Sequence, residues 1–152
     1  MDDDSPYDIS VALECDGRDI DESEIHRAVR ATLRQQGCPS ATISVAVVTD
    51  SHIASLNEKY LNHSGPTDVL SFDLGDDALD GEIVVSLDTA RRESEARGHA
   101  VAAELLLYVI HGTLHLLGFD DRTQADARRM QAEQTRILTG LGFSGIVGAE
   151  AS

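Results

Sequence analysis

The sequence has two cysteines, no tryptophan and a single lysine, and these scarcities limit what the chain can be. Cys15 and Cys38 form no Cys-x-x-Cys pair, so we expect free thiols rather than a disulfide framework or a sulfur metal site. The most apolar stretch, Ala102 to Ile110, is too short to span a membrane. The acidic N-terminus shows no basic segment followed by an apolar one, so no signal peptide is expected. Together these absences predict a cytoplasmic protein without a membrane segment.

Basic residues are also scarce. The chain has 12 lysines and arginines against 27 acidic residues, which gives a net charge of −15. Proteins gain nonspecific affinity for nucleic acid mainly by neutralising phosphates with lysine and arginine. A chain this acidic should therefore repel RNA in bulk, and RNA chemistry would need a local basic patch or a partner that presents the substrate. The other proportions are ordinary for a globular protein. The length fits one domain over residues 1–152, with the tail after about residue 143 loosely held.

The most informative stretch is the eleven-residue run from His111 to Asp121. Its two histidines, His111 and His115, are four residues apart in an apolar, helix-prone run, so both rings lie on one helical face. Gly118 follows within a turn and can adopt the left-handed conformation that ends a helix and returns the chain. Asp121 would then provide a third ligand, and three protein ligands with an open fourth position are typical of catalytic zinc. Histidines at this spacing also occur without a metal, and that alternative stays open.

This run resembles the signature of the YbeY family of endoribonucleases, which are rRNA maturation factors. The family pattern is His-Gly-x-Leu-His-Leu-x-Gly-Tyr/Phe-Asp-His, and the chain matches it from His111 to Asp120. It departs at Asp121, where the family usually has its third zinc-binding histidine. Aspartate is also a zinc ligand, but its charge favours harder cations. We therefore expect one Zn²⁺ per chain held by His111, His115 and Asp121, with Mn²⁺ or Mg²⁺ as alternatives.

Three further segments resemble the same family in the same order: Leu56 to Tyr60, Pro66 to Phe72, and Gly81 to Ile83. After the first of these the family normally has an arginine that is thought important for activity, and this chain has Leu61. An arginine there could stabilise phosphate charge, and either Arg91 or Arg92 could replace it. The candidate substrate-binding residues are Thr67, Ser71 and Arg91. The candidate general base is Asp68.

Hydrophobic periodicity predicts an α+β fold with a small four-stranded mixed sheet packed with about five helices. The last but one helix is apolar nearly all round and should be the central buried one, with the metal site at its end. With the family resemblance, the expected arrangement is zincin-like. The predicted strands are 7–13, 42–48, 67–73 and 81–87. Three predicted helices have caps at Asp21, at Asp50 or Ser51, and at Thr123. The other two start at Ser86 or Asp88 and at His99 or Ala100.

The resemblance implies a metal-dependent, single-strand-specific endoribonuclease that acts in 16S rRNA 3′-end maturation and ribosome quality control. Its partners would be rRNA and the small ribosomal subunit. Gly112 occupies the place of the glutamate in His-Glu-x-x-His proteases, which counts against peptide hydrolysis. Two alternatives remain open. One is a metal-dependent hydrolase of another substrate class, favoured by the acidic charge and Leu61. The other is a non-catalytic ribosome assembly factor with a structural metal.

Overall fold

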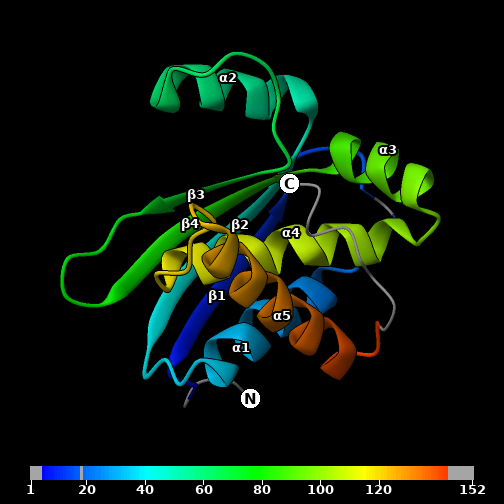
Figure 1. Cartoon of the computed structure of the whole chain (residues 1–152). Coiled ribbons are helices and arrows are strands. Elements are labelled where there is room, and N and C mark those ends of the chain that lie inside the picture. The colour runs from blue at the N-terminus through cyan, green and yellow to red at the C-terminus, as the bar shows by residue number, and fades with distance from the viewer. Residues whose placement is uncertain (1–4, 18, 144–152) are drawn as a thin grey trace.

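A computed structural model describes residues 5–17 and 19–143 of the chain (Figure 1). The predicted loose tail beyond residue 143 lies outside this described part. The fold is α+β, as predicted, and its elements follow the predicted order. They are β1 (Tyr7–Leu13), α1 (Glu22–Gln35), β2 (Ala41–Val48), α2 (Asp50–Leu61), β3 (Val69–Asp73), β4 (Leu79–Ser86), α3 (Leu87–Arg97), α4 (Val101–Leu116) and α5 (Gln124–Gly140).

The four strands form one mixed sheet in the order β1-β2-β4-β3. Strands β1, β2 and β4 are parallel, and β3 runs antiparallel to β4. The small four-stranded mixed sheet is confirmed, and the antiparallel strands β3 and β4 form a hairpin. The prediction started β3 at residue 67, which is too early. Val69 N donates a hydrogen bond to the Asp68 carboxylate, and strand pairing begins at Val69. The antiparallel β3 lies at the edge of the sheet, and this edge borders the site described below.

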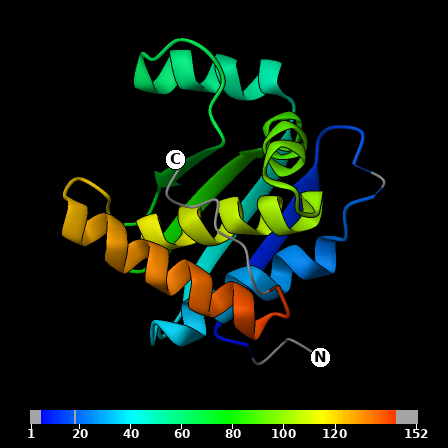
Figure 2. The same cartoon turned by 45° about the vertical axis from the view of Figure 1, so that its right-hand side comes forward.

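Helices cover both faces of the sheet (Figures 1 and 2). Helices α1, α4 and α5 lie on one face, and α2 lies on the other. The central strand β2 is therefore apolar on both sides: Ile43, Val45 and Val47 join the larger core with α1 and α4, whereas Val48 joins the smaller core beneath α2. Alternate side chains of a strand point to opposite faces, which explains this division.

Helix α4 is the most buried helix, as its composition predicts. No single described helix is long and apolar enough to cross a membrane, although α3 and α4 pass that test together across a 119° bend. The predicted caps at Asp21 and Thr123 are confirmed, and Ser86 caps the helix that was predicted to start at Ser86 or Asp88. The predicted cap of α2 is wrong, because Thr49 caps that helix. The Asp50 carboxylate instead accepts hydrogen bonds from Ser86 and Thr89 and pairs with Arg92.

Candidate metal centre

The last turns of α4 bring His111 and His115 together, as their spacing predicts. Their Nε2 atoms are 3.1 Å apart, and their ring centroids are 4.6 Å apart. Gly118 then adopts a left-handed φ of 102°, and Phe119 N donates to Leu114 O at 3.0 Å to close the turn. This turn carries the chain back over the helix to Asp121. One ligand atom from each of His111, His115 and Asp121 lies within 4.8 Å of the others.

A buried glutamine on α5 orients the first histidine. The Nδ1–H of His111 donates to Gln134 Oε1 at 2.6 Å, and Gln134 is only 2% exposed. Because Nδ1 carries the proton, the lone pair of His111 Nε2 faces His115. Such outer hydrogen bonds fix the tautomer and ring orientation of metal-ligating histidines. The sequence did not predict this role of Gln134. The only signal was a polar residue within an apolar helical stripe.

The spacing and the chemistry of the three side chains fit a metal ion. Two nitrogens bound to one tetrahedral zinc lie roughly 3.3 Å apart, given Zn–N bonds of about 2.0–2.1 Å. The two Nε2 atoms are 3.1 Å apart in this structure. Two imidazoles and a carboxylate suit zinc and tolerate manganese. The group therefore fits a divalent ion held by His111, His115 and Asp121.

The electrostatic environment keeps His115 available as a ligand. Burial lowers the pKa of His115 below its usual range, and the neighbouring His111 lowers it further. The charge of Asp121 and the backbone of Phe119 partly oppose this shift. The ring is consequently neutral at pH 7, and a metal ion binds the neutral form of imidazole.

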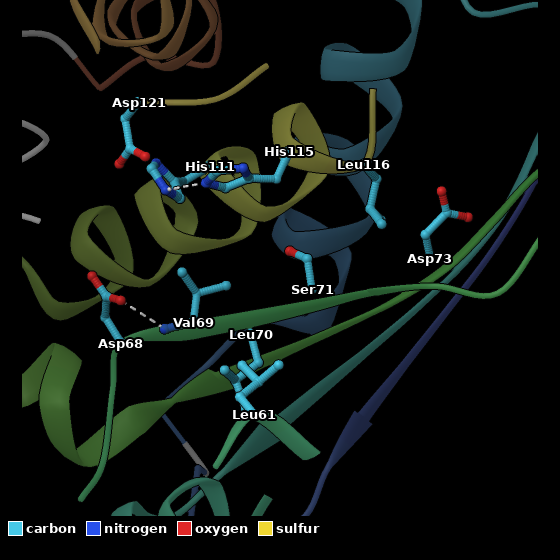
Figure 3. Close-up of a pocket in the computed structure, with 10 residues that line it drawn as sticks. All are labelled: Leu61, Asp68, Val69, Leu70, Ser71, Asp73, His111, His115, Leu116 and Asp121. Carbon is cyan, nitrogen blue, oxygen red and sulfur yellow. Dashed lines mark hydrogen bonds between the residues drawn. The ribbon is translucent and has the colours of Figure 1, made fainter. Parts of the chain in front are cut away.

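The three residues open into a cavity of about 480 Å³ that follows the edge of the sheet (Figure 3). Strand β3 forms its floor with Val69 and Ser71, and Asp68 lies at the end of this strand. Leu61, from the end of α2, lines the opposite side of the strand from the histidines. Leu61, at the position where the resemblance led us to expect an arginine, therefore lines the cavity but contributes no charge to it.

Helix α4 approaches the sheet most closely at Gly112. A Cβ atom at this position would lie 2.8 Å from Ile83 Cγ2 and 3.0 Å from Ser71 Oγ. The Ser71 hydroxyl donates to Gly112 O at 3.1 Å, which ties β3 to the histidine helix. A side chain as large as the protease glutamate has no room here, so glycine at position 112 is a packing requirement of this helix. The close contact also fixes the distance between the histidines and the edge strand.

The remaining predicted residues fall in different places. Asp68 and Ser71 line the cavity that contains the histidines, whereas Thr67 lines a neighbouring pocket that shares Asp68. Arg91 lines neither pocket, because its guanidinium pairs with Asp19 at 2.9 and 3.1 Å. Its neighbour Arg92 lines the second pocket.

The fold and the site define a class: an α+β protein with a His-His-Asp group, fit to hold a metal, beside a cleft at the edge of its sheet. A sequence model described as "Endoribonuclease YbeY" matches residues 11–142, so the chain belongs to the YbeY family of endoribonucleases.

Relatives support this assignment over nearly the whole chain. The chain is 38% identical over 131 residues to Endoribonuclease YbeY of Carboxydothermus hydrogenoformans, with 82% of this chain and 91% of the relative covered. It is 39% identical over 135 residues to Endoribonuclease YbeY of Moorella thermoacetica, with 80% and 86% covered. The solution structure of TM1509 from Thermotoga maritima has the same fold, with a TM-score of 0.62 at 24% identity and coverage of 87% and 90%.

Proposed function

We propose that this protein is a metal-dependent endoribonuclease specific for single-stranded RNA. The observation that carries the proposal is the convergence of His111, His115 and Asp121 within 4.8 Å at an open cleft, in a chain that belongs to an endoribonuclease family. From the family we further propose a cytoplasmic role in 16S rRNA 3′-end maturation and ribosome quality control. Its partners would be rRNA and the small ribosomal subunit.

Each residue of the centre has a distinct part in this proposal. His111, held by Gln134, and the neutral ring of His115 provide two nitrogen ligands, and Asp121 provides a charged oxygen ligand. A bound Zn²⁺, Mn²⁺ or Mg²⁺ would polarise a phosphoryl oxygen and lower the pKa of water at the site. The carboxylate charge of Asp121 partly neutralises the ion, so the site depends less on zinc than a three-histidine centre does.

Asp68 is the proposed general base. It lines the same cavity, and its Oδ1 atom accepts from Val69 N at 2.8 Å, which holds the carboxylate at the end of β3. A fixed carboxylate facing the cleft can accept the proton of an attacking hydroxyl or water. Ser71, on the same strand, would contact the sugar–phosphate backbone, and Thr67 would contact the sugar from the neighbouring pocket.

Single-strand specificity fits the apolar surface beside the cleft. Tyr60 is 57% exposed, packs edge-on against Phe72 at 5.7 Å, and adjoins Leu61 at the cleft. The amine of Lys59 lies 5.1 Å from the centre of the Tyr60 ring. Unpaired bases stack on exposed aromatic rings, and a nearby cation attracts phosphate. Stacking would give this acidic chain an affinity for RNA that its net charge of −15 opposes.

Cleavage assays with matched RNA substrates test the proposal. The expected result is cleavage of a single-stranded oligonucleotide but not of its duplex, lost in chelator and restored by added Zn²⁺, Mn²⁺ or Mg²⁺. His115→Ala should abolish cleavage, whereas His26→Ala, on helix α1 and outside both the metal group and the cleft, should leave it intact.

The same preparations distinguish the alternatives. Metal bound without RNA cleavage, but with binding to small ribosomal subunits, would replace the proposal with an assembly factor that has a structural metal. Metal bound with neither property would indicate a hydrolase of another substrate class. Leu61 in place of an arginine favours that second candidate, because the cavity wall it forms is apolar.

A further inference from the structure

A second pocket continues from the metal cleft on the far side of Asp68. It has a volume of about 360 Å³ and shares Asp68 with the cleft. Its other walls come from the chain before β3 and from helices α3 and α4. The lining residues that matter here are Thr67, Asp68, Arg92, Glu93, Arg97 and Tyr108.

Tyr108 brings an unused hydroxyl to this pocket. The side chain is 3% exposed, and its hydroxyl lies beside the Glu104 carboxylate but makes no hydrogen bond of ordinary geometry among the described residues. Burial strongly raises the pKa of this hydroxyl, and the Glu104 carboxylate adds to the rise, so the group stays a neutral donor. Buried polar groups in native proteins are nearly always satisfied, and an unsatisfied one requires an explanation. A ligand in the pocket would provide the missing partner.

The charges around the pocket indicate what kind of ligand it takes. Arg97 pairs with the fully buried Glu104 and with Glu93 at 3.2 Å. Arg92 pairs with Asp50 at 2.6 Å. Both guanidinium charges are thus already neutralised, and Asp68 adds a further carboxylate to the wall. Such a surface disfavours another anion and favours a neutral group with both donors and acceptors.

We propose that this pocket binds the nucleoside part, base and ribose, of the nucleotide next to the scissile phosphate, with the Tyr108 hydroxyl hydrogen-bonded to it. The inference rests on the proposed function. The nucleoside is the part of an RNA strand that is neutral and carries both donors and acceptors. The phosphate lies toward the histidines, and the strand crosses over Asp68, the residue that the two cavities share.

The test is a nuclear magnetic resonance titration of the full-length chain with adenosine, guanosine, cytidine, uridine and inorganic phosphate. At least one nucleoside should bind and shift the amide signals of Thr67 and Arg92, and phosphate should not compete. Tyr108→Phe should raise the dissociation constant roughly fivefold or more, the effect of one hydrogen bond. The melting temperature of Tyr108→Phe should stay unchanged or rise, because the variant removes an unsatisfied buried group.

Tyr7→Phe is the matched control. The Tyr7 hydroxyl donates to Cys38 O at 2.6 Å, so this variant should lower the melting temperature and leave nucleoside binding unchanged. The proposal is overturned if no nucleoside binds, if shifts gather at Tyr60 instead, or if Tyr108→Phe binds like the unmodified chain. Nucleosides contain no scissile bond, so failure here leaves the proposed cleavage standing. Binding without any RNA cleavage would instead overturn the nuclease alone.

Discussion

Replacement of Gly112 by alanine tests how tightly the histidine helix is seated on the sheet. The new Cβ would lie 2.8 Å from Ile83 Cγ2, 3.0 Å from Ser71 Oγ and 3.1 Å from Val69 Cγ2. Alanine favours the helix by about 1 kcal/mol, whereas overpacking a rigid core costs about 1–3 kcal/mol. Ile83 is fully buried on β4, which lies between β2 and β3, so its side chain cannot move aside. The cost of overpacking therefore exceeds the gain in helix propensity.

Because Ile83 is rigid, we take the upper part of the overpacking range, about 2–3 kcal/mol, and subtract the helix gain of about 1 kcal/mol. We therefore expect Gly112→Ala to lower the free energy of unfolding by about 1–2 kcal/mol, measured by urea denaturation. At about 2–4 °C per kcal/mol for a chain of this size, the melting temperature falls by roughly 2–8 °C. RNA cleavage should fall as well, because α4 must move away from β3 to relieve the contacts.

The control for this prediction is the glycine that ends α5. Nothing lies within 4 Å of a Cβ at Gly140. Gly140→Ala should therefore be neutral or stabilise the protein by up to about 1 kcal/mol. If Gly112→Ala were as stable as the unmodified chain, the close approach of α4 to the sheet would be refuted.

Three other substitutions test separate parts of the account. Gln134→Met removes the acceptor that orients His111 and should weaken zinc affinity about 10–100-fold in a calorimetric titration; unchanged affinity would contradict the orienting role. Tyr60→Ala should weaken single-stranded RNA binding by about 1–3 kcal/mol in fluorescence anisotropy, with stability unchanged. For Asp50, burial raises the pKa, but hydrogen bonds from Ser86, Arg92 and Thr89 outweigh it and lower the pKa overall. Its stabilisation is therefore present above the unfolded value of 3.8 and is lost as the pH falls through the lower folded value. Asp50→Asn should lose about 1–3 kcal/mol at pH 7, a loss that shrinks below about pH 4 in denaturation curves; a pH-independent loss would contradict this.

The sequence predicted those features that depend on local periodicity. The buried stripe of α1, the all-round apolar α4 and the two histidines on one face follow from helical spacing. Gly118 predicted the turn that returns Asp121 to the histidines, because few other residues adopt its φ of 102°. These features need no knowledge of how distant elements pack.

Features that depend on packing between distant elements were not predictable. Gln134 reaches His111 only because α5 lies across α4, and no local pattern specifies that crossing. Arg91 and Arg92 are neighbours on one helix and point about 100° apart, so only the placement of α3 decides which one lines a pocket. The residues around Asp50 predicted that it caps α2. Its carboxylate instead accepts hydrogen bonds from Ser86 and Thr89 at the N-terminus of α3.

The central claim is that His111, His115 and Asp121 together bind one metal ion, and calorimetric zinc titration tests it most directly. We expect one zinc per chain and an affinity reduced by more than about tenfold in Asp121→Ala. Asp121→His should retain or tighten binding. Asp120→Ala is the matched control, because Asp120 accepts from Arg122 N and is not part of the metal group; its affinity should equal that of the unmodified chain. Zinc affinity unchanged by Asp121→Ala would contradict the proposed third ligand and the site built on it.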